Sequence, residues 1–179
     1  MIVTLGTHNI QYPLLEIEPG LTLVLGPSGV GKTTLLRALH GTLTGQIEGE
    51  LPLQLERTSL MPQQHTWVPY LSMREHMMLT GGISRDGIDQ LGLEGLEKKF
   101  AHQLSVGQLQ RFSLLSCLSV DAEAYMLDEP SSALDTDLAA RSFAFLKQHI
   151  QAHPKSYYIA VTHDDRMIEA FADAKTIAL

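Results

Sequence analysis

A glycine-rich segment that ends in a lysine and a threonine constrains this chain more than any other feature. It reads Gly26-Pro27-Ser28-Gly29-Val30-Gly31-Lys32-Thr33-Thr34. The spacing Gly-x-x-x-x-Gly-Lys-Thr stands between an apolar stretch over 21–25 and an expected helix over 32–39. Glycines let the backbone curl so that several N–H groups converge on one anion, and the helix N-terminus adds partial positive charge. The segment therefore predicts a phosphate-binding loop.

Two side chains of this loop carry the chemistry expected of a nucleotide site. The ammonium group of Lys32 would reach the β- and γ-phosphates, and the hydroxyl of Thr33 would ligate Mg²⁺. The remaining loop residues, from Gly26 to Thr34, would bind phosphate oxygens. The loop alone does not choose among nucleotide enzymes, because the same pattern would suit a small nucleotide monophosphate kinase.

Two adjacent carboxylates, Asp128 and Glu129, follow a second apolar stretch over 124–127 and precede Pro130. In isolation an acidic pair before a proline is more often a solvated turn. However, open α/β sheets bind ligands at the carboxyl ends of their strands, and neighbouring strand residues point in opposite directions. We therefore assign Asp128 to Mg²⁺ and Glu129 to the attacking water.

Expected strands alternate with expected helices along the chain. Strands are expected over 2–5, 14–17, 21–25, 125–127, 157–161 and 176–179, and helices over 32–39, 105–118, 138–150 and 166–172. This alternation predicts an α/β fold with a largely parallel central sheet. Helical patches broken by glycines predict a small inserted helical lobe over about 65–118. With 179 residues, the chain is expected to form a single domain over 1–179.

The charge and the apolar patterning exclude several classes of protein. Acidic residues outnumber basic ones by 20 to 13, and no run of Lys or Arg is present, so no nucleic-acid partner is expected. No apolar stretch reaches the roughly 18–20 residues that a membrane span needs. The one cysteine, Cys117, lies in an apolar run and is expected to be a buried thiol. We expect a cytoplasmic protein that is peripheral to the membrane through a partner.

A third motif, Leu104-Ser105-Val106-Gly107-Gln108, gives the chain a specific resemblance. As local structure, Ser105 and Gln108 form a capping box that opens a helix. The segment also matches four of the five residues of the Leu-Ser-Gly-Gly-Gln signature of ABC ATPases. From end to end the chain resembles the nucleotide-binding domain of an ABC transporter. The resemblance implies a P-loop NTPase core with N-terminal antiparallel strands and an inserted helical subdomain.

The resemblance implies roles for residues outside the first two motifs. Gln63 would sense the γ-phosphate and contribute to the Mg²⁺ site, and Pro69 and Met73 stand at the family's positions after it. His163, after the last long strand, would contact the γ-phosphate. Asp135 would lie in a loop that communicates across a dimer.

The signature residues imply a working unit of two chains. In this family Ser105, Gly107 and Gln108 would bind the ATP held by a second copy, in an ATP-dependent head-to-tail homodimer. The chain would then be an ATP-hydrolysing subunit that uses Mg²⁺ and drives integral membrane transporter subunits, which dock near Gln63 and the helical lobe. A non-transport ABC ATPase acting on nucleic acid or ribosomes is the alternative, and a monophosphate kinase is a third possibility that lacks an Arg-rich lid here.

Three features depart from the family pattern. Val106 replaces the first glycine of the signature, and a β-branched residue fits there if the position is helical, as we expect, but not if it needs positive φ. The adenine-stacking aromatic is not evident: Tyr12 is a candidate but could equally be a packed strand residue. The stretch between Lys32 and Gln63 is expected to lack much of the family's antiparallel hairpin.

Overall fold

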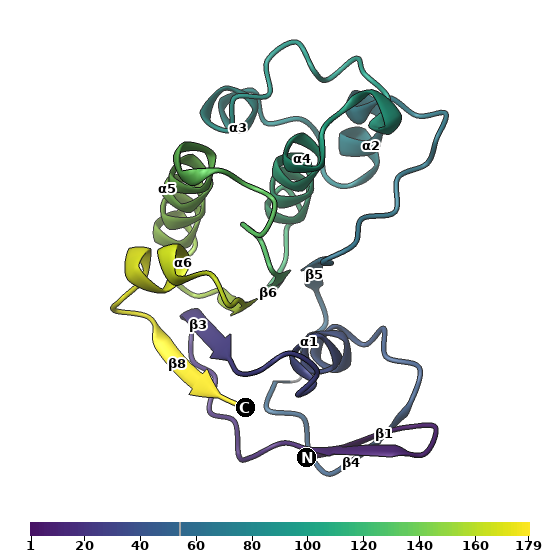
Figure 1. Cartoon of the computed structure of the whole chain (residues 1–179), viewed down its shortest axis with the longest axis vertical. Helices are drawn as coiled ribbons and strands as arrows, with labels where there is room; N and C mark the ends of the chain where they lie inside the picture. Colours follow the sequence, from purple (N-terminus) through teal and green to yellow (C-terminus); the bar gives the residue numbers. More distant parts are fainter. Residues whose placement is uncertain (54) are drawn as a thin grey trace.

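The structure is a computed structural model that describes residues 1–53 and 55–179. The larger of its two β-sheets is parallel throughout. The sheet has the strand order β5-β6-β7-β3-β8 (Figure 1). Its strands are β3 (Gly20–Leu25), β5 (Thr58–Met61), β6 (Ala124–Asp128), β7 (Tyr157–Val161) and β8 (Lys175–Ala178). The predicted α/β fold with a largely parallel central sheet is confirmed.

The smaller sheet is antiparallel, as expected for the N-terminal strands. It has the order β2-β1-β4 and consists of β1 (Ile2–Leu5), β2 (His8–Gln11) and β4 (Gln46–Glu48). The predicted strand over 14–17 is wrong. The chain instead turns back at Gly6, whose φ is 58°, and pairs Leu5 with His8. Leu14, an apolar residue that suggested the strand, is 90% exposed.

Helices cover both faces of the parallel sheet. They are α1 (Lys32–His40), α4 (Val106–Leu118), α5 (Thr136–Ala152) and α6 (Asp165–Ala170). Figure 1 shows α1 between the two sheets, with α4 and α5 on the other side of the parallel sheet. Residues along β6 alternate accordingly: Ala124 and Met126 pack in the core with α1, whereas Tyr125 and Leu127 pack in the core with α4 and α5. This burial on both faces explains why the strand is apolar throughout.

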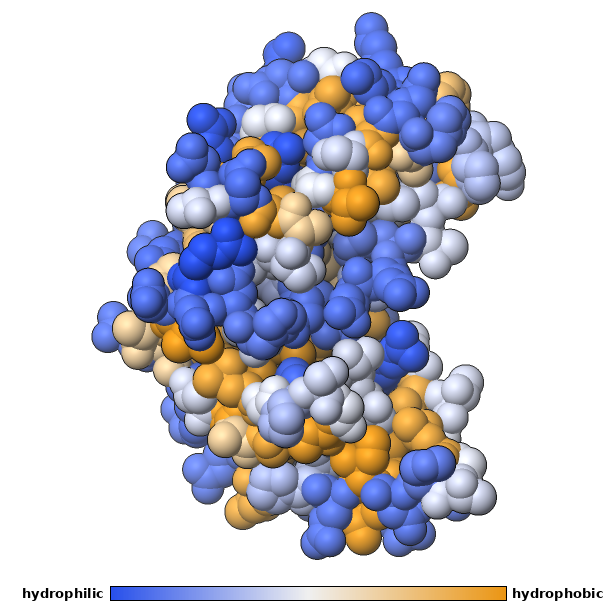
Figure 2. Space-filling view, in the orientation of Figure 1, coloured by the Kyte–Doolittle hydropathy of each residue, from blue (hydrophilic) through white to orange (hydrophobic). Residues whose placement is uncertain are grey.

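Short helices fill the stretch between β5 and α4. They are α2 (Met73–Leu79), α3 (Arg85–Gln90) and the 3₁₀ turn η1 (Ala101–Gln103). Helix α2 begins at a capping box in which Ser72 and Glu75 bond to each other's backbone N–H groups, and Met73 and Met77 pack into the core with α4. Figure 2 shows the molecule hollowed along one side, between this helical segment and the part that contains α1 and the antiparallel sheet.

Cys117 on α4 is a buried free thiol, as predicted, and burial raises its pKa to about 12.

None of the helices in the described part of the chain is both long enough and apolar enough to span a membrane.

Candidate nucleotide site

The predicted phosphate-binding loop connects the end of β3 to the start of α1. Gly26, Gly29 and Gly31 all have positive φ, at 152°, 82° and 106°. A Cβ atom at Gly31 would stand 2.8 Å from the hydroxyl oxygen of Tyr12 and 2.9 Å from a side-chain carbon of Ile10. The loop therefore needs glycine here both for its backbone conformation and for space.

Lys32 lies across the curled loop. Its Nζ donates hydrogen bonds to the carbonyl oxygens of Gly26, at 2.8 Å, and Pro27, at 2.9 Å. Gly31 caps α1 without a side chain, and the first turn of the helix contains no acidic residue. The first N–H groups of α1 thus face the loop without a side-chain acceptor, which is the arrangement that binds anions at helix N-termini.

A cavity of about 220 Å³ joins the loop to residues from other elements. Its walls are Ile10, Ser28, Gly29, Gly31, Lys32, Thr33, Thr34, Gln63, Asp128, Glu129 and Val161. The structure therefore brings together the loop, Gln63 and the acidic pair, which stand far apart in the sequence. Three other loop residues, Gly26, Pro27 and Val30, do not line this cavity.

Asp128 is the last residue of β6 and is buried beside the loop. Burial raises the pKa of its carboxyl group, and a hydrogen bond from Thr33 lowers it. The Oδ1 atom of Asp128 is buried without a hydrogen-bond partner among the described residues. An unpartnered carboxylate oxygen beside a threonine hydroxyl matches the hard oxygen ligands that Mg²⁺ prefers. These residues fit a Mg²⁺ ion.

Glu129 has an unusual backbone conformation directly after β6. Its φ of 53° places it in the left-handed region, where a residue with a side chain costs about 1–2 kcal/mol. Its N–H donates to the carbonyl oxygen of Val161 at 2.9 Å, which continues the pairing of β6 with β7. Strained residues of this kind cluster at functional sites. The conformation turns the Glu129 side chain out of the strand alternation and to the cavity wall.

The carboxylate of Glu129 is buried, and its two oxygens differ in their hydrogen-bond partners. Its Oε1 lies 2.6 Å from Nδ1 of His163, whereas its Oε2 is buried without a hydrogen-bond partner in the described part of the chain. His163 itself is exposed and does not line the cavity. The structure thus places His163 against Glu129, a contact that the sequence did not suggest.

The signature residues lie at the start of α4. Ser105 is the N-cap, and the predicted capping box with Gln108 is confirmed, with bonds of 3.2 and 2.9 Å. Val106 is the first helical residue and is 71% exposed, so the expectation of a helical position there is confirmed. Neither Ser105 nor Gly107 nor Gln108 lines the cavity that contains Lys32.

A model of the ABC transporter family matches residues 14–132. The chain belongs to the ABC transporter family. Its sequence is 33% identical over 180 residues to the sulfate/thiosulfate import ATP-binding protein CysA of Mycobacterium tuberculosis, covering 89% of this chain and 50% of that protein. This ABC cassette thus spans half the length of that relative.

Two solved structures share the fold of the cassette. The match to the structure of the RNase-L Inhibitor covers 99% of this chain and 35% of the inhibitor chain, with a TM-score of 0.87 and 25% sequence identity. The match to the dimeric structure of a bacterial ABC transporter cassette covers 99% of this chain and 91% of the cassette chain, with a TM-score of 0.79 and 22% sequence identity. The resemblance expected from the motifs is confirmed at the level of family and fold.

Tyr12 packs inside the cassette. It is 3% exposed, and its hydroxyl donates to the carbonyl oxygen of Gly31 at 2.8 Å. Burial raises its pKa to about 12. Of the two roles weighed for Tyr12, the packed residue is the correct one, and its ring has no exposed face for adenine.

The loop before Asp135 is held by two residues that the sequence motifs did not identify. Asp135 caps α5 by accepting a bond from the N–H of Leu138. Asp164 accepts a 2.6 Å bond from the Ser131 hydroxyl, and Arg166 donates to the carbonyl oxygen of Leu134 at 3.1 Å. Asp164 and Arg166 stand close after His163 in the sequence, but no motif spacing marks them. The structure alone shows that they bind the loop 131–134.

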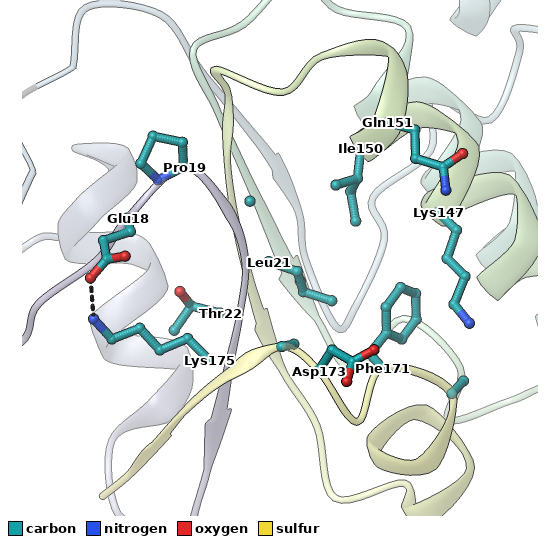
Figure 3. Close-up of a pocket in the computed structure, with 13 residues that line it drawn as sticks. Glu18, Pro19, Leu21, Thr22, Lys147, Ile150, Gln151, Phe171, Asp173 and Lys175 are labelled. Carbon is teal, nitrogen blue, oxygen red and sulfur yellow. Dashed lines mark hydrogen bonds and ion pairs between the residues drawn. The ribbon is translucent and has the colours of Figure 1, made fainter.

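A second cavity, of about 530 Å³, lies at the other end of the sheet (Figure 3). It stands at the amino ends of β3 and β8, whereas α/β folds bind ligands at the carboxyl ends. Its two lysines are engaged: Lys175 bonds to Glu18 at 2.8 Å, and Lys147 lies 5.1 Å from the ring centre of Phe171. This cavity contains none of the predicted site residues.

Proposed function

We propose that the chain is the ATP-binding and ATP-hydrolysing subunit of a membrane transporter, formed by a single domain over 1–179 with a helical lobe over about 65–118. The observation that carries this proposal is the 220 Å³ cavity that joins Lys32 and Thr33 to Gln63, Asp128 and Glu129. A phosphate cradle, a site for a hard cation and a buried carboxylate are the three parts that phosphoanhydride hydrolysis requires.

The loop would bind the phosphates of ATP. Backbone N–H groups from Gly26 to Thr34 and the ammonium of Lys32 would neutralise their negative charge. Thr33, Gln63 and Asp128 would hold Mg²⁺, which when bound would supply further charge neutralisation on the β- and γ-phosphates. The single basic residue among those that line the cavity is Lys32, so the loop depends on it.

Glu129 would orient the attacking water and accept its proton. Its Oε2 is the free acceptor, because Oε1 already lies against His163. A buried carboxylate with one unpartnered oxygen suits a general base, which typically contributes about 10²–10⁴ in rate. His163 would hold the carboxylate in place and would contact the γ-phosphate once ATP is bound.

The working unit would be an ATP-dependent head-to-tail homodimer. Ser105, Gly107 and Gln108 stand at the start of α4 and do not line this chain's own cavity, and Ser105 and Val106 are exposed. The N-terminus of this 13-residue helix would face the γ-phosphate of ATP held by a second copy. Support comes from the solved cassette of the same fold, which is dimeric.

Integral membrane transporter subunits are the proposed partners of the dimer, with the cassette on the cytoplasmic face. A groove of about 210 Å³ runs between the segment after β5, helix α2 and helix α4. Close to it, α2 exposes Met78 and Leu79, and Tyr70 is also exposed. The Nε1 atom of Trp67, which lines the groove, is buried without a partner among the described residues. The exposed apolar side chains beside this groove suit a protein partner.

A second candidate function is a non-transport ABC ATPase. The structural likeness to the RNase-L Inhibitor favours it, because that protein's name is not that of a transport protein. Against it stand the formal net charge of −7 and the relative named as an import ATP-binding protein. We expect no nucleic-acid partner.

Affinity purification of the tagged chain from detergent-solubilised membranes tests the proposal. We expect an integral membrane protein to co-purify, and the complex to release phosphate from ATP. Lys32→Ala should retain the partner but lose hydrolysis, whereas Lys147→Ala, an exposed lysine outside the site, should retain both. Recovery with ribosomes or nucleic acid in place of a membrane protein would favour the second candidate.

A further inference from the structure

Gln110 is a buried polar residue of α4 for which the motifs supply no role. Its residue surface is 4% exposed, and its side chain bonds entirely to the segment that follows β6. Its Nε2 donates to the carbonyl oxygen of Glu129 at 2.7 Å and to the hydroxyl oxygen of Ser132 at 3.1 Å. Its Oε1 accepts from the N–H of Ala133 at 2.9 Å. All of its polar atoms are therefore used.

One of these bonds goes to Glu129, whose backbone is strained. Within 1–53 and 55–179, Glu129 is the one residue other than glycine with positive φ. Its N–H is held by Val161 of β7, and its carbonyl oxygen accepts from Gln110 and, at 3.2 Å, from the Ser132 hydroxyl. A left-handed conformation persists only when its surroundings enforce it. Gln110 supplies the shorter of the two side-chain bonds to the Glu129 carbonyl.

The chemistry of the site suits glutamine at position 110. A carboxamide offers both donors and an acceptor on one planar group, so it can bond to the Glu129 carbonyl and the Ala133 N–H together. A glutamate would lack the donors, and a leucine or methionine would lack both. Gly107 permits the close approach of the helix, because a Cβ atom there would stand 2.9 Å from the Ala133 carbonyl oxygen.

We propose that Gln110 is a positioning residue for hydrolysis, which acts by holding the left-handed backbone of Glu129 so that its carboxylate stays at the cavity. This inference rests on the proposed function, in which Glu129 activates water. Gln110 does not line the cavity. Its replacement should therefore affect turnover and not ATP binding.

The bonds of Gln110 also connect the signature residues at the start of α4 to Glu129. Gln110 lies one turn beyond Ser105 and Gly107, which are proposed to bind the ATP of a second copy. Through Gln110 this end of α4 is bonded to the glutamate that serves the chain's own ATP. A contact that the signature makes in the proposed dimer would therefore be connected to the Glu129 backbone through the side chain of Gln110.

The first test is the kinetics of Gln110→Leu. We expect kcat to fall about 10- to 100-fold, the range produced by small misplacements of catalytic groups, with the KM for ATP within about twofold of wild type. Gln110→Met, which is unbranched and has no strong polar group, is the second variant if the leucine variant folds poorly. Ser59→Ala is the control, because it removes a buried 2.9 Å bond that joins the far end of α4, at Cys117, to β5. The control should lower the melting temperature without lowering kcat more than about twofold.

A double-mutant comparison separates positioning from general damage. In a Glu129→Gln background, Gln110→Leu should cause little further loss of single-turnover rate, because the group that it positions is already gone. An equal loss in both backgrounds, or a kcat unchanged by Gln110→Leu, would overturn the inference. If Glu129→Gln itself retained wild-type turnover, the proposed function would fail instead, so the two failures are distinguishable.

Discussion

The Nδ1 atom of His163 lies 2.6 Å from Oε1 of Glu129, so an exposed imidazole holds one oxygen of a buried carboxylate. The second oxygen, Oε2, has no partner within the part of the chain that the structure describes. This asymmetry assigns the two oxygens different tasks in the proposed reaction. One oxygen would be held by the protein, and the other would receive the proton of the attacking water.

His163→Ala is expected to lower kcat by about 10- to 100-fold, because Glu129 loses the group that holds its Oε1. ATP affinity should change much less, because Lys32 and the loop would still bind the phosphates. Single-turnover hydrolysis and binding of a fluorescent ATP analogue measure the two effects. His163→Gln, which keeps a hydrogen-bond donor, should recover part of the rate. An equal loss of rate in both variants would argue against the positioning role.

Val106→Gly is expected to leave hydrolysis within about tenfold of wild type, which corresponds to roughly 1.4 kcal/mol in the barrier. Val106 is exposed and helical, so its replacement leaves the Ser105 side chain and the Gly107 N–H in place. The glycine should lower stability slightly, by up to about 1 kcal/mol. Steady-state phosphate release and thermal unfolding measure both effects. A gain in rate far beyond tenfold would mean that the natural valine impairs the signature.

Asp164 makes part of the stability of the cassette depend on pH. Hydrogen bonding from Arg166 lowers the pKa of Asp164 from 3.8 to about 2. Because the folded-state pKa is depressed, the stabilisation is present above the ordinary pKa and is lost as the pH falls from about 4 through about 2. Asp164→Asn should lower the free energy of unfolding by about 2 kcal/mol relative to wild type at pH 6. At pH 3 this difference between the variant and wild type should be about 1 kcal/mol smaller.

Urea unfolding at the two pH values measures this effect. Asp173→Asn, at an exposed site on another part of the surface, is the matched control and should leave the free energy of unfolding nearly unchanged. A difference between wild type and Asp164→Asn that stays constant from pH 6 to pH 3 would contradict the assignment of the pKa to the folded-state contacts of Asp164.

Local patterns in the sequence predicted those parts of the fold and site that depend on neighbouring residues. The spacing from Gly26 to Thr33 and the apolar strand before Asp128 each place a group at a strand end, and the structure joins them in one cavity. The prediction of a strand over 14–17 was wrong because its apolar residues suggested burial, whereas Leu14 is exposed. The strand that pairs with β1 instead follows the turn at Gly6.

Contacts between distant segments could not be predicted in this way. The bond between Glu129 and His163 depends on the parallel pairing of β6 with β7, which brings the ends of the two strands together. The bonds from Gln110 to the segment after β6 depend on how closely α4 packs there, which a glycine at 107 permits. Neither the register of a parallel sheet nor the approach of a helix is encoded in a short motif.

Glu129→Gln is expected to trap the ATP-bound dimer. The amide keeps the size of the side chain but cannot accept the proton of water, so ATP should persist between Lys32 of one chain and Ser105 of the other. Size-exclusion chromatography of this variant should show a dimer with Mg-ATP and a monomer without it. Adding Ser105→Arg should abolish the dimer, because a bulky cation would occupy the interface. A monomer in both conditions, with ATP still bound, would show either that dimerisation needs the membrane partner or that the signature with Val106 is not functional.

The most direct test of the proposed hydrolysis is phosphate release by Glu129→Gln, measured beside its ATP affinity and the rate of the wild-type chain. We expect unchanged or tighter ATP binding, with turnover lowered by about 10²–10⁴. Phosphate release at the wild-type rate, with ATP binding intact, would contradict the assignment of Glu129 and the site built around it.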